Sequence, residues 1–386
     1  TAQEIRNALI DFKKSGKFII AYSGLYTQNM YYIATVADKI ILNPTGIVEF
    51  RGLSANPVFY KNALDKLGIE VQVVKVGTYK SFAEQYTNTE MSERNKEQVS
   101  VYINSIWNSI LEDISASRHI SKEKLNAYAD EMMTFQLTKK SLEYGLVDTL
   151  LYDDGVKKML ASYLGVEKED DVKFISLNNM KNVPDKSREY VKEKIAIVYA
   201  IGDIDNNVSY DDNGIKSSKL IKTLQDVRKD DNIKAVVFRV NSPGGSAYGS
   251  EQIWREISLL KKEKPVIVSM GDYAASGGYY ISCAADVIVA DPTTLTGSIG
   301  IFGIIPNTKG LTDKLGITFD NVKTNKMSDM PSINRPFTEN ERNIMQLYVN
   351  EGYELFVKRC ADGRKMSIDS IKAIAEGRVW TGKDAK

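Results

Sequence analysis

The chain has 386 residues, of which 43% are hydrophobic and 26% are charged, and its formal net charge is +1. So small a net charge gives no electrostatic reason to expect nucleic acid or a strongly anionic substrate as partner. The length exceeds the size at which one hydrophobic core keeps growing, so two globular domains are predicted. No stretch approaches the roughly 18 apolar residues of a membrane-spanning helix, and no secretory signal opens the chain.

In chain order, the first clear patterns predict a strand over Val73–Val76 and a long amphipathic helix over Glu93–Ile114. Residues 167–193 are charged and show little periodicity. This composition predicts a linker, with one short strand at Val172–Ile175.

The second half of the chain alternates strand patterns with helix patterns. Its apolar runs predict strands, of which Ile195–Ala200 and Ala235–Val240 are expected to be buried strands of a parallel sheet. Its helically spaced apolar residues predict amphipathic helices. The expected strands are Ile195–Ala200, Ala235–Val240, Val266–Met270 and Val287–Val289, and the expected helices are Ser217–Arg228, Glu251–Lys262 and Glu339–Ala361. This alternation predicts an α/β fold built of βαβ units with right-handed crossovers.

The sequence also contains an internal repeat. Residues 25–52 align without a gap on residues 273–300, at a constant separation of 248 residues. The same separation places residues 65–69 on an identical Asp-Lys-Leu-Gly-Ile segment at residues 313–317. Five identical residues in register, behind a block that aligns without a gap, predict a tandem duplication of one α/β module. We therefore expect an N-terminal module over residues 1–166, the linker over 167–193 and a C-terminal module over 194–386.

Each copy lacks something that the other supplies. Thr1 aligns with Gly249, so the start of the first module is expected to be missing from this chain. The second module is likewise expected to lack its end. Ser276 of the second copy aligns with Gln28 of the first, and Lys80 of the first aligns with Ser328 of the second.

A Pro-Gly-Gly turn follows the strand predicted at Ala235–Val240. Gly244 and Gly245 let the backbone turn tightly and present N–H groups to a ligand without an intervening side chain. A tetrahedral intermediate needs such fixed donors, so this turn is a candidate oxyanion hole. The alternative reading is a strand-to-helix turn that merely requires glycine.

A serine between small residues follows the next strand. Ser276 lies in an Ala-Ala-Ser-Gly-Gly segment, where a sharp turn would expose its hydroxyl to an approaching carbonyl. The N–H of Gly277 would supply a second oxyanion donor. Ser242 and Ser246 compete as nucleophiles, but proline follows Ser242 and both serines flank the oxyanion turn itself.

A nucleophilic serine needs a base. His119 is the one histidine of the chain, but the second copy has Lys365 at its position, so this position accepts polar residues generally. Lys80 follows a predicted strand and the turn at Gly77, and lies between aromatic residues. Desolvation can lower a lysine pKa by up to about 3–5 units, enough for a neutral amine near pH 7.

Five segments together resemble the signal peptide peptidase A (protease IV) family in its long, duplicated form. They are Gly77–Ser81, Arg239–Ser246, Ala274–Tyr280, Leu295–Gly300 and Gly377–Gly382. The resemblance implies a serine protease with a Ser/Lys dyad and two tandem modules of the ClpP/crotonase fold. It implies Ser276 as the nucleophile and Lys80 as the general base. Gly245, Gly244 and Gly277 would donate to the oxyanion, and Ser298 would orient the lysine.

The same resemblance implies a homotetramer that hydrolyses cleaved signal peptides, without cofactor or metal and without nucleic acid. It places the catalytic part outside the cytoplasm, at a cell membrane, held by an anchor that this chain lacks. Because each copy retains half of the dyad, we expect the site to form where the two copies face each other within one chain. A site shared between two chains is the second possibility.

Two other functions remain open from the sequence. A crotonase-like acyl-CoA enzyme would share the fold and the oxyanion hole but would have no use for Ser276 together with Lys80. A catalytically silent scaffold would result if the serine and the lysine were held apart.

Overall fold

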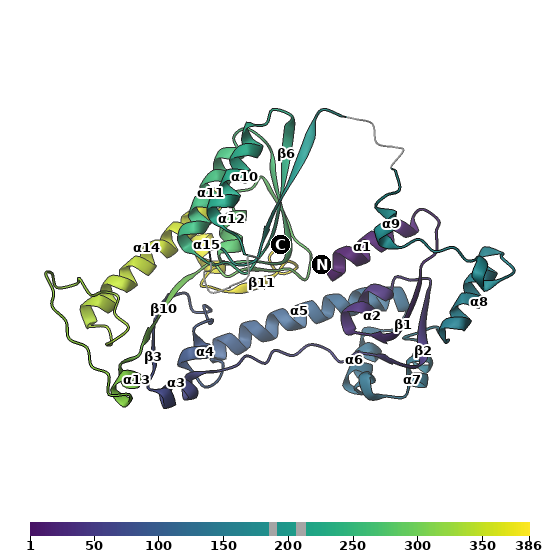
Figure 1. Ribbon diagram of the computed structural model, residues 1–386, viewed down its shortest axis with the longest axis horizontal. Helices are drawn as coiled ribbons and strands as arrows, with labels where there is room; N and C mark the ends of the chain where they lie inside the picture. The colour runs from purple at the N-terminus through teal and green to yellow at the C-terminus, as the bar shows by residue number, and fades with distance from the viewer. Residues whose placement is uncertain (185–190, 206–213) are drawn as a thin grey trace. The chain divides into compact units, whose positions relative to one another are not determined.

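The computed structural model describes residues 1–184, 191–205 and 214–386, and within it the chain forms two compact units (Figure 1). The first unit comprises residues 1–53 and 107–192, and the second comprises residues 54–106 and 193–386. Residues 54–106 of the first repeat therefore fold with the second repeat, and the units do not follow the repeat boundary. Residues 185–190 of the predicted linker lie outside the described residues.

The first unit contains a three-stranded parallel sheet in the order β1-β2-β4. Large apolar side chains on the sheet and its helices are fully buried, among them Tyr31, Ile40 and Leu111. The elements of this unit are α1 (Ala2–Lys13), β1 (Ile20–Tyr26), α2 (Gln28–Ala34), β2 (Lys39–Val48), α6 (Lys122–Asp130), η1 (Met133–Phe135), α7 (Thr138–Glu143), β4 (Thr149–Leu150), α8 (Asp153–Leu164), η2 (Glu169–Asp171) and α9 (Leu177–Met180).

The second unit contains a six-stranded sheet in the order β11-β9-β7-β6-β5, with β8 paired to β7. All neighbours run parallel except β11, which is antiparallel to β9. In register, Ala274 of β7 lies beside Ser242 of β6 and Thr296 of β9. The strands are β5 (Lys194–Ile201), β6 (Ile233–Ser242), β7 (Val266–Ala275), β8 (Val287–Val289), β9 (Leu295–Gly297) and β11 (Val379–Thr381).

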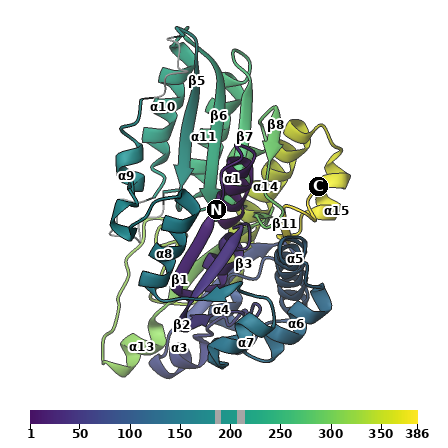
Figure 2. The same ribbon diagram turned by 90° about the vertical axis from the view of Figure 1, so that its right-hand side faces the viewer.

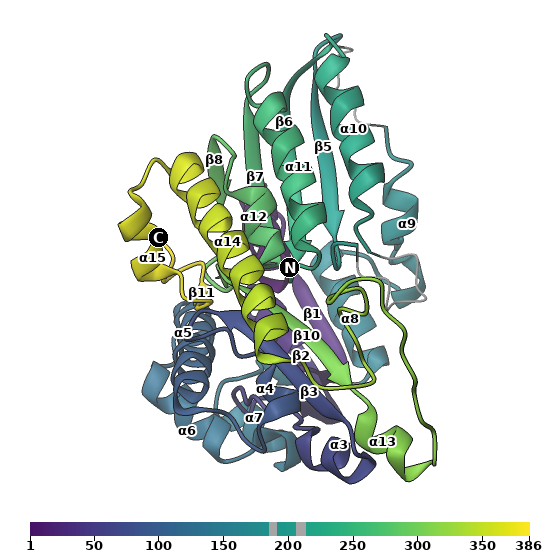
Figure 3. The ribbon, with the colours of Figure 1, turned by 90° about the vertical axis from the view of Figure 1, so that its left-hand side faces the viewer.

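Helices α10, α11 and α12 lie together in front of this sheet in Figure 3, and the sheet lies in front of α10 and α11 in Figure 2. A separate antiparallel pair joins β3 of the first repeat to β10 of the second. The remaining elements are α3 (Lys61–Leu67), β3 (Glu70–Val76), α4 (Glu84–Thr87), α10 (Ser217–Lys229), α11 (Ala247–Leu260), α12 (Gly277–Ser282), β10 (Ile301–Asn307), α13 (Lys309–Lys314), α14 (Glu339–Arg364) and α15 (Ile368–Ile374). Helix α5 (Glu93–Arg118) begins in the second unit and ends in the first.

The structure confirms the predicted α/β class and the expected strands and helices of the second half. The two copies also share a long helix at matching positions in their sequences. This helix is α5 in the first copy and α14 in the second, and each has 26 residues. A capping box of Thr338 and Glu341 fixes the start of α14. In the described ranges of the chain, no helix is both long and apolar enough to cross a membrane.

Two expectations about strands were wrong. Val172–Ile175 forms no strand, and Phe174 and Ile175 are exposed, because no strand of the described residues pairs with this segment. The strand at Ile195–Ala200 exists as β5, but it is not buried on both faces. It lies at the edge of the sheet, and its alternate side chains Ile195, Ile197 and Tyr199 are exposed.

Candidate active site

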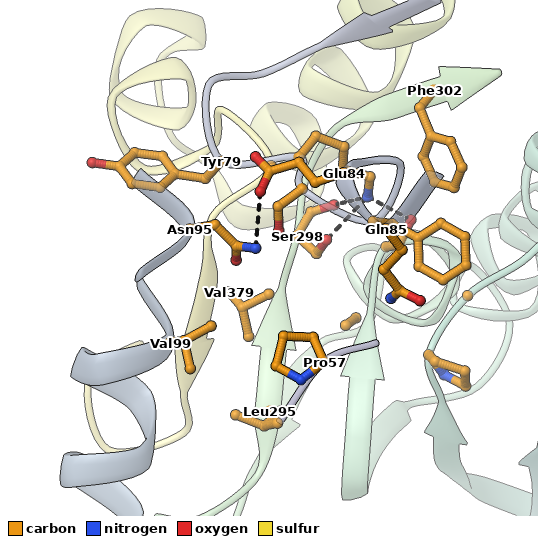
Figure 4. A pocket seen from close by; sticks show the side chains of 18 of the residues that line it. Pro57, Tyr79, Glu84, Gln85, Asn95, Val99, Leu295, Ser298, Phe302 and Val379 are labelled. Carbon is orange, nitrogen blue, oxygen red and sulfur yellow. Dashed lines mark hydrogen bonds between the residues drawn. The ribbon is translucent and has the colours of Figure 1, made fainter. Parts of the chain in front are cut away.

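The second unit holds a cavity of about 710 Å³ whose wall includes Lys80, Ser276, Ser298 and Gly245. The structure thus brings together the lysine of the first repeat and the serine of the second, within one chain and one compact unit. Figure 4 shows two of the hydrogen bonds in this cavity ending on Ser298, which lies between Tyr79 on one side and Phe302 on the other.

Ser276 occupies a sharp turn between strand β7 and helix α12. Its φ of 53° lies in the left-handed region, which a residue with a side chain adopts at a cost of about 1–3 kcal/mol. The Ser276 N–H donates to the Gly297 carbonyl at 2.9 Å, so the neighbouring strand β9 holds the turn. This geometry is that of a nucleophile elbow, in which the turn places the hydroxyl on an accessible rim.

The amine of Lys80 reaches three oxygen atoms. Lys80 Nζ lies 3.1 Å from Ser276 Oγ, 3.0 Å from Ser298 Oγ and 2.9 Å from the Ser298 carbonyl oxygen. The amine also faces the aromatic ring of Phe302, and Lys80 Nζ lies 5.8 Å from the centre of that ring. The Lys80 side chain is therefore fixed by Ser298 and directed at the hydroxyl of Ser276.

This set of partners suits a neutral amine. A neutral lysine has two N–H donors and one lone pair. The two donors can satisfy the two oxygen atoms of Ser298, which leaves the lone pair to accept the proton of the Ser276 hydroxyl. Among the described residues, no carboxylate lies within 4.0 Å of Lys80 Nζ.

Burial lowers the pKa of the Lys80 amine from its ordinary 10.5 to about 7. Only 5% of the residue is exposed, and desolvation penalises the charged form. A substantial fraction of Lys80 is therefore neutral at physiological pH, as a general base must be.

The same burial predicts how Lys80→Met should change stability with pH. Between about pH 7 and the unfolded pKa of about 10.4, the unfolded wild type binds more protons than the folded one, so its stability rises with pH. Methionine has no such dependence. We expect Lys80→Met to be more stable than the wild type at pH 7, by an upper value of about 4 kcal/mol, and to lose this advantage by pH 10. Denaturant unfolding of both proteins at pH 7 and 10 measures it, and a difference independent of pH would contradict it.

The glycines predicted for the oxyanion hole differ in their bonding. The Gly244 N–H donates to Ser242 Oγ at 3.2 Å. Gly245 and Gly277 have no acceptor for their N–H groups among the described residues. An added Cβ on Gly277 would lie 3.2 Å from the Gly245 nitrogen, so the two N–H groups lie close together. Gly245 lines the cavity, whereas Gly277 is buried beside Ser276, so these two N–H groups are the candidate oxyanion donors that lack a protein acceptor among the described residues.

The competing nucleophiles and the histidine have other roles in the structure. Ser242 is fully buried, and Ser246 caps α11 by accepting the Gly249 N–H at 3.1 Å. His119 is exposed at the end of α5, with a φ of 55°, and it does not line the cavity.

In each case, the equivalent position of the other repeat carries no comparable group. Gln28 stands at the place of Ser276, and its side chain bonds the backbone of Arg51 and Gly52 at 3.0–3.1 Å. Phe50 stands at the place of Ser298 and is fully buried. Ser328, at the place of Lys80, is exposed and bonds the Asn325 carbonyl at 3.0 Å.

The sequence did not point to three side chains near the dyad. Phe302 is adjacent to the Lys80 amine, and Gln98 and Glu376 bond the loop that carries Lys80. Phe302 lies two residues after the segment Leu295–Gly300, and Glu376 directly precedes the segment Gly377–Gly382. This closeness to the family-like segments is the one sequence feature that could have indicated them. No sequence feature indicated Gln98, because it is one of many polar residues on the long helix α5.

Comparison with known proteins identifies the family of this chain. The family model "Peptidase family S49" matches residues 11–167 and 258–386. Protease 4 of Salmonella typhi is 38% identical over 99% of this chain and 62% of its own length, so the chain spans about three fifths of that relative. A putative signal peptide peptidase of Enterococcus faecium is 34% identical over 50% of this chain and 56% of its own.

Among solved structures, a ClpP1 mutant from Listeria monocytogenes aligns over 49% of this chain and 85% of its own, with 14% identity and a TM-score of 0.31. The family model, in contrast, covers most of the chain and includes both Lys80 and Ser276. By that match, the chain belongs to peptidase family S49.

Proposed function

We propose that this protein is a serine endopeptidase in which Ser276 is the nucleophile and Lys80 is the general base. The observation that carries the proposal is the 3.1 Å distance between Lys80 Nζ and Ser276 Oγ, in a buried setting that favours the neutral amine. Membership of peptidase family S49 supports the same reaction class.

In the acylation step, neutral Lys80 accepts the hydroxyl proton of Ser276 while the serine oxygen attacks the peptide carbonyl. The negative charge on the carbonyl oxygen is stabilised by the N–H groups of Gly245 and Gly277. The Lys80 ammonium then donates its proton to the leaving amine, and an acyl group remains on Ser276. Ser298 keeps the lysine in position during both proton transfers.

In the second step, Lys80 accepts a proton from a water molecule that attacks the acyl group. The tetrahedral intermediate again places its oxyanion near Gly245 and Gly277. Collapse of this intermediate returns the proton to Ser276 and releases the carboxylic acid product.

Extended apolar peptides suit this cavity. Phe82, Leu295 and Phe302 contribute to its wall, and the burial of apolar substrate side chains would supply binding energy. We propose cleaved signal peptides as the substrate class, which the name of the Enterococcus faecium relative supports. A tetrameric assembly outside the cytoplasm, at a membrane, is part of the same proposal and has its support in the family resemblance.

The dyad geometry also weighs against the two alternatives. A silent scaffold requires the serine and the lysine to be apart, and they lie within hydrogen-bond distance. An acyl-CoA enzyme of the crotonase type would use the oxyanion donors but would not need a lysine directed at a serine.

Covalent labelling tests the proposal directly. A fluorophosphonate should modify wild-type protein at Ser276, as located by tandem mass spectrometry, and an apolar fluorogenic peptide should be hydrolysed. Ser276→Ala should show neither reaction, whereas Ser328→Ala, a control at an exposed serine, should behave as the wild type. Tight CoA binding without labelling of Ser276 would instead favour the acyl-CoA enzyme.

A further inference from the structure

The loop that carries Lys80 has little regular structure of its own. It connects β3 to α4, and its one internal backbone bond joins the Lys80 N–H to the Gly77 carbonyl at 3.2 Å. Backbone groups that are buried without partners cost free energy, so such a loop needs partners from elsewhere in the fold. The position of the Lys80 amine depends on those partners.

The first partner is Glu376, which follows α15. Its carboxylate Oε2 accepts both the N–H and the hydroxyl of Thr78, each at 2.9 Å. Its backbone carbonyl accepts the Tyr79 N–H at 2.8 Å. Glu376 therefore receives three hydrogen bonds from the two residues that precede Lys80.

The residue after Glu376 packs directly against the lysine. Gly377 has a φ of +74°, and an added Cβ there would lie 2.7 Å from both the nitrogen and the Cβ of Lys80. Gly77 in turn packs closely against the backbone of Glu376, because a Cβ added to Gly77 would lie 2.6 Å from the Glu376 carbonyl. Backbone contact this close is possible only with glycine on both sides, and it leaves the loop little freedom to shift.

The second partner is Gln98 on α5, of which only 3% is exposed. Its amide nitrogen donates to the Tyr79 carbonyl and to Ser81 Oγ, both at 3.0 Å. Its amide oxygen accepts the Val379 N–H at 3.3 Å. Gln98 thus joins the residues on either side of Lys80 to strand β11.

The same turn also holds the residue that binds the amine. The Arg378 carbonyl accepts the Ser298 N–H at 2.7 Å, and the Gly377 N–H donates to the Ile299 carbonyl at 2.8 Å. Residues 376–378 are therefore bonded both to the Lys80 loop and to Ser298. No hydrogen bond of Glu376 or Gln98 involves the Lys80 amine or Ser276 among the described residues.

We propose that Glu376 and Gln98 are positioning residues that clamp the Lys80 loop from two sides and keep the amine in line with the Ser276 hydroxyl. This inference rests on the proposed function of the dyad. It assigns to the turn at Glu376 the task of keeping the base and Ser298 in a fixed mutual position. The contacts of Gln98 add a second anchor, so the loop is held at Thr78, Tyr79 and Ser81.

Glu376→Ala tests the clamp. A displacement of the order of 1 Å can cost about 100-fold in rate, so we expect kcat to fall about 10-fold to 100-fold with KM changed less than about 2-fold. A loosened loop also admits water to the amine, so the acidic limb of the pH–rate profile should move to higher pH. Glu376→Gln retains an oxygen that can accept from Thr78 and should recover part of the activity.

A second readout does not depend on turnover. Competitive labelling with trace acetic anhydride, followed by mass spectrometry, gives the titration of the Lys80 amine in the absence of substrate. Its midpoint should also move to higher pH in Glu376→Ala. The matched control is Glu351→Gln, on an exposed position of α14, which should change neither readout.

Two variants keep the test decisive if Glu376→Ala does not fold. Thr78→Val removes one of the two bonds to the carboxylate and leaves the backbone bond, and Gln98→Met keeps the length but not the hydrogen bonds. Both should lower kcat and move the acidic limb in the same direction. An unchanged acidic limb and an unchanged Lys80 titration in these folded variants would reject the clamp, with or without a loss of rate. The proposed peptidase would stand in that case, as long as the wild type is active and Lys80→Met is not.

Discussion

Lys80→Met should abolish peptide hydrolysis, with a loss of about 10⁴-fold or more in kcat, to the level of Ser276→Ala. Methionine keeps the length of the side chain and removes the only nitrogen within hydrogen-bond distance of the Ser276 hydroxyl among the described residues. Without that base the serine remains protonated and is a weak nucleophile. Hydrolysis of an apolar fluorogenic peptide by the two variants measures the loss.

The double variant Lys80→Met/Ser276→Ala distinguishes a dyad from two independent contributions. Residues that act as one unit are not additive, so the double variant should be no slower than either single variant. Circular dichroism and thermal melting must show that all three proteins are folded. Substantial activity in Lys80→Met would show that another group is the base, and additive losses would show that the two residues act separately.

The strands and helices of the second half could be predicted because their signals are local. Apolar runs such as Ala235–Val240 and Val266–Met270 mark strands by themselves, and the helices between them have clear spacing. The wrong prediction at Val172–Ile175 shows the limit of this logic. A short apolar run becomes a strand only where a neighbouring strand pairs with it, and that neighbour is a property of the tertiary structure.

The proximity of Lys80 and Ser276 could be predicted from the differences between the repeats. Gln28 opposite Ser276, and Ser328 opposite Lys80, indicated that each copy keeps one half. What the repeat could not show is that residues 54–106 fold with the second repeat. That assignment depends on long-range partners, such as the pairing of β3 with β10.

The finer geometry of the site has no sequence signature. Ser276, Ser298 and Glu376 all have positive φ values between 51° and 53°, which no composition or spacing indicates. Such conformations persist only where the surrounding fold imposes them. The three bonds that Glu376 receives likewise join residues about 300 positions apart in the chain, beyond the reach of any local pattern.

The electrostatic surroundings of Lys80 decide its behaviour with pH. Glu84 and Asp203 line the same cavity, and Glu84 accepts hydrogen bonds from Ser92 and Asn95. Lys75 donates to the Lys80 carbonyl at 3.4 Å rather than to its side chain. Since desolvation is the cause of the lowered pKa, the amine responds mainly to its burial.

The rate of hydrolysis should therefore follow the deprotonation of Lys80. Only the neutral amine can accept the serine proton, and its pKa is lowered to about 7. The neutral fraction falls tenfold for each pH unit below that value. We expect kcat/KM to be half its maximum near pH 7 and about 100-fold below it at pH 5.

A histidine would give a similar acidic limb, because its ordinary pKa is about 6.5. The chain has one histidine, His119, which does not line the cavity, so His119→Gln should leave the profile unchanged. Glu376→Ala, in contrast, should move the limb to higher pH by exposing the Lys80 amine to water. A limb that moves with His119→Gln, or a rate that does not fall between pH 7 and 5, would contradict Lys80 as the base. Because both variants are read from one pH series, the identity of the base and the means of its positioning are tested together.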